Sequence, residues 1–215
     1  LSAIINFPNL KFSSTSINFG CLLNDTVKSE VVTVRNVSSI TSDFSWHFRT
    51  LNMLDARNMT NASTAAIGFG FDVRPIRSRL QPGEEEDIEF TLSGACNRKY
   101  QCVCVCEVSG GPNYEISLMG ETSNICFALE KTCVDFGTVW IGQTETSEWS
   151  LSNTGKVAYD FEVEEDSNSS VFVLETLRGR VLPGEKQGLV ARFQPILPQD
   201  HEACLVIREI GRAHV

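Results

Sequence analysis

The sequence contains one structural unit twice. Asn18-Phe19-Gly20 recurs as Asp135-Phe136-Gly137, 117 positions later (137 − 20). The segment Leu80-Gln81-Pro82-Gly83-Glu84 recurs as Val181-Leu182-Pro183-Gly184-Glu185, but only 101 positions later (184 − 83). The difference of 16 positions (117 − 101) indicates an insertion in the first copy. Fixed spacing of this kind is typical of tandem arrays of one domain, and such arrays usually bind or support other proteins rather than catalyse reactions.

Apolar residues alternate with polar ones along most of the chain. Ile88, Phe90 and Leu92 alternate with Glu89 and Thr91. The second copy shows the same alternation at Trp149 and Leu151, at Phe161 and Val163, and at Leu189, Ala191 and Phe193. A period of two residues predicts strands with one face on a core and the other in water. No long stripe with the helical period of 3.6 residues occurs, so we expect an all-β protein.

The turn residues agree with this prediction. Gln81-Pro82-Gly83-Glu84 and Leu182-Pro183-Gly184-Glu185 place Pro at the second and Gly at the third position, as a type II turn requires. Gly110-Gly111-Pro112-Asn113 separates two strand-like runs and predicts a hairpin loop. Short strands joined by such turns predict tandem immunoglobulin-like antiparallel β-sandwiches. An all-β barrel is the structural alternative.

The spacing of the repeats divides the chain into four parts. We expect a lead-in segment over 1–16, a first immunoglobulin-like domain over 17–122 with the insertion at about 50–70, and a second over 123–208. Residues 209–215 are expected to be a non-native tail, because the last six look like the translation of a common sequencing adapter.

The last strand of the second domain is expected to be missing. In the first copy 37 residues separate Gly83 from Gly120 (120 − 83), and the same step from Gly184 passes the end of the chain at Val215. The sheet edge left behind would be unpaired and prone to association. Within the insertion of the first copy, a short helical turn over 51–57 and a surface loop over 59–66 are expected.

Charge and hydropathy exclude several classes of partner. The 215 residues leave room for two small domains, and a hydrophobic share of 42% suffices for their cores. The net charge is −9 and no stretch concentrates Lys or Arg, so we expect neither nucleic acid nor an anionic membrane as a partner. No run approaches the roughly 20 apolar residues that span a bilayer, and residues 1–10 lack the pattern of a signal peptide.

Three of the eight cysteines form the run Cys102-Val103-Cys104-Val105-Cys106. On a strand these cysteines share one face about 6.8 Å apart, at about 3.4 Å per residue, which is too far for neighbours in the run to form a disulfide. The run also lacks the spacing of zinc ligands. We therefore expect buried, reduced thiols and an intracellular location, with disulfides or a metal site as alternatives. Five glycosylation sequons favour a secreted protein instead; they begin at Asn24, Asn36, Asn58, Asn61 and Asn168.

The sequence offers few groups for catalysis. His47 follows Trp46, so it is expected on the opposite, solvent-facing side of its strand, and His201 lies in a polar turn. Gly68-Phe69-Gly70 is too short for a phosphate-binding glycine pattern. Acidic residues gather in two places. One is the run Glu84-Glu85-Glu86-Asp87, and the other consists of Glu162, Glu164, Glu165 and Asp166. We interpret both as solvated faces and not as sites for calcium or a basic partner. We expect no enzyme activity, no catalytic, cofactor-binding or metal-binding residues, no cofactor and no small-molecule substrate.

These motifs occur in an order that resembles the sequence of ASH-type immunoglobulin-like domains. Domains of this type form tandem repeats in a very large protein of motile cilia, and they are related to major-sperm-protein-like modules. The resemblance covers roughly 17–207. It rests on the Phe-Gly opening, the strand that ends in Asn, and the Leu-Gln-Pro-Gly-Glu turn. Its most specific part is Gly110-Gly111-Pro112-Asn113-Tyr114-Glu115, closing on Leu118-Met119-Gly120-Glu121.

This resemblance implies a structural, protein-binding module of the ciliary axoneme. It implies a place in the central-pair apparatus of a cilium or flagellum, a contribution to axoneme assembly and cilium movement, and other axonemal proteins as partners. Two alternatives stay open. A cell-surface immunoglobulin-like adhesion module is favoured by the sequons and the even cysteine count. A major-sperm-protein-like adaptor for acidic peptides would need a basic groove.

Overall fold

The computed structural model describes residues 6–49, 70–95, 97–165 and 171–210. The chain divides into two compact units, which we call unit 1 (1–123) and unit 2 (124–215). All of the described secondary structure is β-strand, which confirms the all-β prediction. No helix long and apolar enough to cross a membrane occurs in this part of the chain. The expected helical turn over 51–57 and loop over 59–66 lie outside the described residues.

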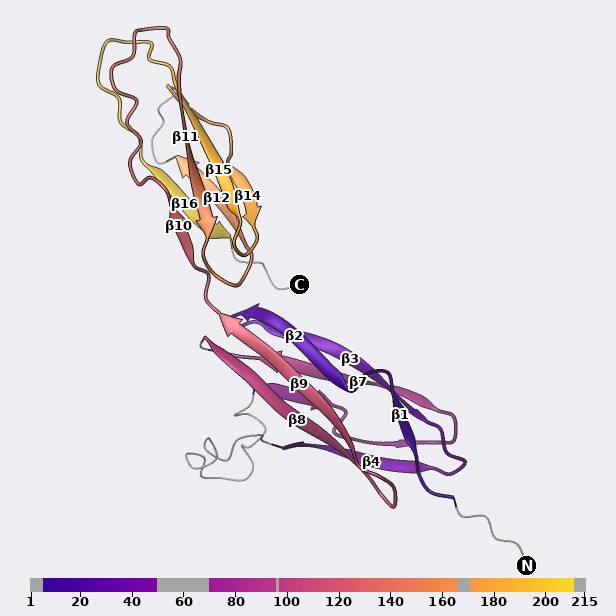
Figure 1. The fold of residues 1–215 in the computed structure, drawn as a ribbon. Coiled ribbons are helices and arrows are strands. Elements are labelled where there is room, and N and C mark those ends of the chain that lie inside the picture. The colour runs from indigo at the N-terminus through magenta and orange to yellow at the C-terminus, as the bar shows by residue number, and fades with distance from the viewer. Residues whose placement is uncertain (1–5, 50–69, 96, 166–170, 211–215) are drawn as a thin grey trace, which may run out of the picture. The chain divides into compact units, whose positions relative to one another are not determined.

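Unit 1 is a sandwich of two sheets (Figure 1). The four-stranded sheet has the order β1-β3-β7-β5, with bounds Leu10–Phe12, Val27–Asn36, Glu85–Ser93 and Phe71–Arg74. The five-stranded sheet has the order β2-β9-β8-β4-β6, with bounds Ser16–Leu23, Tyr114–Ser123, Arg98–Val108, Ser42–Arg49 and Arg77–Leu80. The two sheets remain separate, so the sandwich and not the barrel alternative is found.

The core of unit 1 lies between these sheets. β7 contributes Ile88, Phe90 and Leu92, each of which is fully buried. From the other sheet, β4 contributes Trp46, whose ring meets that of Phe90 edge-on with the ring centroids 5.3 Å apart. The predicted alternation of buried and exposed residues is thereby confirmed. Burial of side chains of this size stabilises the fold by about 1.5–3 kcal/mol each.

Residues 1–16 contribute more than the expected lead-in segment. β1 pairs antiparallel with β3, so that Leu10 lies opposite Asn36 and Phe12 opposite Val34. Leu10 is buried, and the ring of Phe12 packs on that of Tyr114 with the centroids 4.9 Å apart. Three residues are too few to show a period, so this edge strand is recognised only through its partner.

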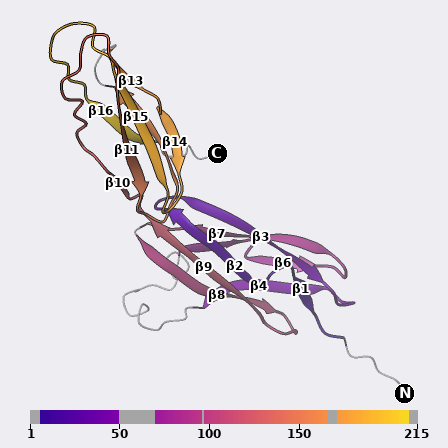
Figure 2. The ribbon, with the colours of Figure 1, turned by 45° about the horizontal axis from the view of Figure 1, so that its top comes forward.

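Unit 2 repeats the same architecture with fewer strands (Figure 2). One sheet has the order β10-β11-β15-β13, with bounds Phe127–Leu129, Glu145–Asn153, Lys186–Phe193 and Phe172–Leu174. The other has the order β14-β12-β16, with bounds Arg178–Val181, Tyr159–Glu165 and Leu205–Ile210.

The register of unit 2 follows the sequence repeat. Phe44 lies opposite Val108 in unit 1, and Phe161 lies opposite Glu209 in unit 2. Phe161 follows Phe44 by 117 positions (161 − 44), and Glu209 follows Val108 by 101 positions (209 − 108). These are the two offsets that separate the repeated motifs. Glu209 and Ile210, which the sequence assigned to a non-native tail, belong to β16. Backbone pairing depends little on side-chain identity, so the strand continues through both residues.

The two Pro-Gly segments form the predicted turns. Gly83 and Gly184 have φ angles of 81° and 79°, the left-handed conformation that the third position of a type II turn requires. The amide of Glu84 donates to the carbonyl of Gln81, and that of Glu185 to Leu182, both at 3.0 Å. The hairpin loop predicted over 110–113 joins β8 and β9.

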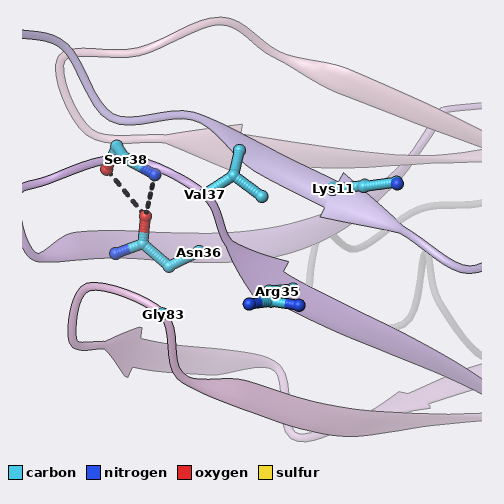
Figure 3. A pocket seen from close by; sticks show the side chains of 6 residues that line it. All are labelled: Lys11, Arg35, Asn36, Val37, Ser38 and Gly83. Atoms are coloured by element: carbon cyan, nitrogen blue, oxygen red, sulfur yellow. Dashed lines mark hydrogen bonds between the residues drawn. The ribbon is translucent and has the colours of Figure 1, made fainter.

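A buried asparagine holds each Pro-Gly turn against the end of a strand. In unit 1 the Asn36 Nδ2 donates to the carbonyls of Ile40 at 2.8 Å and Leu80 at 3.0 Å. Its Oδ1 accepts from the amide of Ser38 at 3.0 Å and from the Ser38 hydroxyl at 2.7 Å (Figure 3). The backbone carbonyl of Asn36 accepts from the amide of Gly83. In unit 2, Asn153 makes the corresponding bonds to the carbonyls of Val157 and Val181 and to the amides of Gly155 and Gly184.

Candidate strand-docking groove in unit 2

An open apolar groove lies in unit 2 at the position that β9 occupies in unit 1. In unit 1, β9 pairs antiparallel with β8 and parallel with β2, and it buries Ile116 and Leu118 completely. Among the described residues of unit 2, no strand pairs with the edge of β16 that faces away from β12. The groove beside this edge has a volume of about 1180 Å³.

Both sheets of unit 2 contribute apolar side chains to the groove. They include Leu129, Leu151, Val163, Ala191, Leu205 and Ile207. Leu205 and Ile207 are half-buried, whereas their counterparts in unit 1, Cys104 and Cys106, are fully buried beneath β9. The groove therefore exposes the same core surface that β9 covers in unit 1.

Three phenylalanines form an aromatic cluster in the wall of the groove. The rings of Phe172 and Phe193 stack with their centroids 4.8 Å apart. The ring of Phe136 lies 5.9 Å from the first and 5.5 Å from the second. Phe136 comes from the repeated Phe-Gly motif, in which the Asp135 carboxylate accepts a hydrogen bond from the amide of Gly137 at 2.8 Å. The Asx turn of this motif thus forms in unit 2, although the strand that contains the motif in unit 1, β2, has no counterpart there.

Two segments that are strands in unit 1 are not strands in unit 2. Residues 98–102 of β8 pair with β9 alone, because β4 pairs only with residues 103–108. Their counterparts at 199–203 have no strand structure, and neither do residues 133–140, the counterparts of β2. The missing strand was expected from the sequence, but these two further losses were not. They follow because a strand needs a partner for its backbone amides and carbonyls.

The rim of the groove is acidic. Asp135, Asp200 and Glu202 line it together with a single lysine among the described lining residues, Lys131. Asp200 and Glu202 are exposed and stand on either side of His201, whose ring lies 5.8 Å from that of Phe193. His201, for which the sequence predicts only a place in a polar turn, therefore lines the groove and contacts the aromatic cluster.

The other residues considered for chemistry do not gather into a site. His47 is exposed beside buried Trp46, as predicted. In the acidic run of unit 1, Glu84 accepts a hydrogen bond from the amide of Gln81, and Asp87 accepts one from the hydroxyl of Thr33. The described residues hold no group of three His, Cys, Asp or Glu side chains that could bind a metal. Gly68 and Phe69 lie outside the described residues.

The cysteines of β8 are core residues. Cys102, Cys104 and Cys106 are free thiols with no exposed surface, which confirms that they share one buried face. Burial raises the pKa of Cys102 and of Cys106 to about 12, and it raises the pKa of Cys104 further with help from its two neighbours. In contrast, Cys133 and Cys204 are exposed on the wall of the groove.

A smaller polar recess lies at the Pro-Gly turn of unit 1 (Figure 3). Its volume is about 410 Å³. Lys11 and Arg35 line it, lie opposite each other in the β1–β3 register, and are both exposed. Arg35 already pairs with the carboxylate of Glu85 at 3.3 Å. The recess has no apolar lining comparable with that of the groove, so the groove is the stronger candidate site.

One sequon is incompatible with glycosylation of the folded protein. The Asn36 side chain is buried, and its Nδ2 donates to two backbone carbonyls. A glycan would replace one of the two hydrogens on this nitrogen, so at least one of these hydrogen bonds would be lost and the sugar would enter the core. The sequons that begin at Asn58, Asn61 and Asn168 lie outside the described residues.

Sequence comparisons find a family model that matches unit 2 and a relative that aligns with both units. Residues 126–210 match the family described as HYDIN/CFA65/VesB-like, Ig-like domain. The hydrocephalus-inducing protein of Mus musculus is 22% identical over 302 aligned positions, which cover 93% of this chain and 6% of that protein. The homolog of Homo sapiens is 31% identical over 136 positions, covering 60% of this chain and 3% of that protein. The chain thus spans a small fraction of the length of these relatives.

Two solved structures are similar to this chain at low sequence identity. The ASH / PapD-like domain of human CEP192 (PapD-like domain 7) is 12% identical, with a TM-score of 0.43, and covers 58% of this chain and 96% of that one. The class 5 fimbriae chaperone CfaA is 13% identical, with a TM-score of 0.43, and covers 95% and 100%. The resemblance to ASH-type Ig-like repeats found in the sequence is confirmed by the family match and by the curated relatives.

Proposed function

We propose that this chain, which resembles the Ig-like repeats of the hydrocephalus-inducing protein, is a structural, protein-binding module of the ciliary axoneme. In this proposal it belongs to the central-pair apparatus, supports axoneme assembly and cilium movement, and binds other axonemal proteins. It acts without catalysis, cofactor or small-molecule substrate.

The similarity that extends across both units is the observation that carries this proposal. The mouse relative aligns with 93% of the chain, so the resemblance concerns the tandem arrangement and not one domain alone. Tandem sandwiches offer long lateral surfaces on which other proteins can bind, whereas their cores serve only stability.

The described surface has features suited to protein binding. Trp140 is 78% exposed and Ile141 is 57% exposed, and both line the groove of unit 2. Large apolar side chains that gather on a surface are typical of interaction sites.

The two alternative functions have less support. The buried Asn36 removes one of the sequons that favoured an adhesion module. An adaptor for acidic peptides needs a basic groove, but Asp135, Asp200 and Glu202 line the groove found here. Like charges would repel such a peptide.

Fractionation of cilia tests the proposed location. Cilia from the organism that expresses the chain would be extracted with detergent, and peptides from both units followed by mass spectrometry. We expect the peptides in the insoluble axoneme, and we expect their loss from axonemes that lack the central pair. A membrane protein of the same cilia serves as the control for extraction. Recovery in the detergent-soluble fraction with a glycan on Asn24 would instead support the adhesion alternative.

A further inference from the structure

We infer that the open edges of β6 in unit 1 and of β14 in unit 2 each bind an extended acidic segment of a partner protein. The segment would add one strand to the sheet, antiparallel to β6 or β14. This inference rests on the protein-binding role proposed above and adds the place and the chemistry of the contact.

Each of these two strands is the last of its sheet. β6 ends the order β2-β9-β8-β4-β6, and β14 ends the order β14-β12-β16; both are labelled in Figure 2. In unit 2 this edge lies on the side of β12 that faces away from β16 and the acidic groove. It would therefore stay open if a further strand paired with β16. It is also independent of the insertion over 50–70, which unit 2 lacks.

Three exposed residues of this edge recur in the two units. Ile76-Arg77-Ser78-Arg79 corresponds to Leu177-Arg178-Gly179-Arg180 at the repeat offset of 101 (177 − 76). Outside the insertion, the other basic residues of unit 1 have no basic counterpart at the two repeat offsets. They are Lys11, Lys28, Arg35, Arg49, Arg74, Arg98 and Lys99, which correspond to Ala128, Glu145, Ser152, Asp166, Glu175, Gln199 and Asp200. Positive charge has thus been kept at this edge alone.

Pairing within the sheet explains only one of the two arginines. Arg79 pairs with Asp43 of β4 at 2.5 Å, and the same pair recurs in unit 2. Arg77 lies opposite Ser45 and is exposed, and it makes no ion pair with a described residue. Its counterpart in unit 2 pairs with Glu162. A guanidinium carries five N–H donors, so even the paired arginines keep donors for a second carboxylate.

An exposed apolar side chain stands beside the arginines in both units. Ile76 is 56% exposed and Leu177 is 52% exposed. Both precede the edge strand, where the chain passes from one sheet to the other. Charged residues alone could serve to keep sheet edges from pairing with each other. A large apolar side chain at the same place works against such protection, so its recurrence favours a binding site.

The backbone of this edge can pair with an added strand. The amide of Trp46 in β4 donates to the carbonyl of Ile76 at 2.9 Å, and the equivalent bond is present in unit 2. Successive residues of a strand direct these groups to opposite sides. The amides and carbonyls of Arg77 and Arg79 therefore point away from β4, towards the open side.

The residues of β6 define the sequence pattern of the bound segment. Successive residues of an antiparallel strand would lie opposite Arg79, Ser78, Arg77 and Ile76. We expect carboxylates at the first and third of these positions, because opposite charges attract across a strand pair. An apolar side chain at the fourth position would pack against Ile76.

β12 shows this pattern on the other side of β14. Asp160 lies opposite Arg180 and Glu162 lies opposite Arg178 in the β12–β14 register. The next residue, Val163, donates its amide to the residue that precedes β14. The bound segment would present the same order of acidic and apolar residues to the open side.

A second copy of this chain is the poorer occupant. Antiparallel pairing of two β6 edges would place the arginines of one copy opposite the arginines of the other. Like charges directly opposite each other destabilise a strand pair. A segment with carboxylates at alternate positions removes this repulsion and replaces it with attraction.

Two synthetic peptides with capped ends test this site on the purified 215-residue chain. The first is Thr-Glu-Thr-Glu-Val-Thr, and the second has Lys in place of both Glu residues. Amide exchange followed by NMR should slow about fivefold at Arg77 and Arg79 when the acidic peptide is at about four times its Kd. The amide of Ser78 already faces β4 and should change little. The lysine peptide should bind at least about tenfold more weakly, and this difference should shrink as salt is raised.

Two substitutions on the protein test the same contacts. Arg77→Glu removes no ion pair with a described residue, so folding should be unaffected. It should weaken the acidic peptide at least about tenfold at β6 and leave the β14 edge of the same molecule unchanged. Ile76→Ser should weaken binding at β6 about fivefold through the lost apolar contact. Lys11→Glu makes the same change of charge at an exposed position of β1 and is the matched control, with affinity at β6 unchanged within about twofold.

Several results would overturn this inference. Absence of binding by the acidic peptide would mean that the arginines only protect the edge. Equal affinity for both peptides, or protection of other amides but not of Arg77 and Arg79, would place the contact elsewhere. A concentration-dependent dimer that protects these two amides without peptide would mean that a second copy occupies the edge. None of these results bears on the ciliary location, because that is tested by fractionation and not with the purified chain.

Discussion

Substitution of Asn36 by Ala should destabilise unit 1 by about 3 kcal/mol. Asn36 makes four side-chain hydrogen bonds, donating to the carbonyls of Ile40 and Leu80 and accepting from the amide and hydroxyl of Ser38. The backbone bonds between its strand and the Pro-Gly turn do not involve the side chain and would persist. The substitution therefore isolates the contribution of one amide group.

The magnitude follows from the burial of its partners. Ser38 is only half-buried and can bond to water after the substitution, so its two hydrogen bonds contribute little to the loss. The carbonyl of Leu80 loses its side-chain donor in a buried position, which costs about 1–3 kcal/mol. The carbonyl of Ile40 is part-buried and can still accept from the Ser38 hydroxyl, whose oxygen lies 3.0 Å away, so this loss costs less. Together the two losses amount to about 3 kcal/mol. A free energy of 3 kcal/mol raises the opening constant of unit 1 more than about 100-fold.

Hydrogen exchange monitored by mass spectrometry measures this effect in each unit separately. The slowest amides of β3 and β7 should exchange about 100-fold faster in the Asn36→Ala variant, while those of β11 and β15 should not change. Asn153→Ala should show the reverse pattern, because Asn153 makes equivalent bonds in unit 2. Asn18→Ala, which removes a single exposed bond to the amide of Gly20, serves as the control and should cost less than about 1 kcal/mol. If Asn36→Ala accelerates exchange no more than Asn18→Ala, the side chain does not hold the turn.

Three further predictions concern the backbone, the first strand and the buried thiols. Gly83→Ala should lower the stability of unit 1 by about 1 kcal/mol in urea unfolding, because a φ of 81° is strained for an L residue. No atom lies within 4 Å of the new Cβ, so the loss would come from the backbone conformation and not from a steric clash. Gly188→Ala, at an equally open position without positive φ, should not be destabilising. Leu10→Ala should cost about 2–4 kcal/mol if β1 belongs to the fold, and a loss below about 0.5 kcal/mol would show that it does not. Burial raises the pKa of the Cys102 thiol from 9.0 to about 12. Above pH 9 this thiol therefore loses its proton in the unfolded chain but keeps it in the folded chain. The free energy of unfolding should consequently fall as the pH rises from 9 towards 12. Urea unfolding in the presence of reductant should show this decline, with a smaller slope in Cys102→Ala and the same slope in Cys204→Ala, whose thiol is exposed.

Local patterns in the sequence predicted the strands and turns because their causes are local. The alternation at Ile88, Phe90 and Leu92 follows from the geometry of one strand, and all three side chains are fully buried. The positive φ of Gly83 follows from the Pro-Gly pair in one turn. The two repeat offsets recur in the strand pairings of the two units, because equivalent strands carry equivalent apolar faces.

Features that depend on distant partners escaped the sequence. The sequence predicts only a lead-in segment over 1–16, because the three residues of β1 show no period and their place depends on pairing with β3. The recurrence of Asn36 and Asn153 was visible, but the reason for it was not. Asn36 reaches Leu80, 44 residues away, and that hydrogen bond exists only once the sheets are in place.

The groove shows the same division most clearly. The sequence by itself determined which segments of unit 2 correspond to the strands of unit 1, because the repeated motifs keep two fixed offsets. Only the tertiary structure showed that residues 133–140 and 199–203, the counterparts of strand residues in unit 1, form no strand. A side-chain pattern states which face of a strand is apolar, but a strand exists only when another segment satisfies its backbone hydrogen bonds. For this reason the sequence predicted which side chains face the core. The edge of β16 and the groove beside it depend on pairing between segments far apart in sequence, so only the tertiary structure showed them.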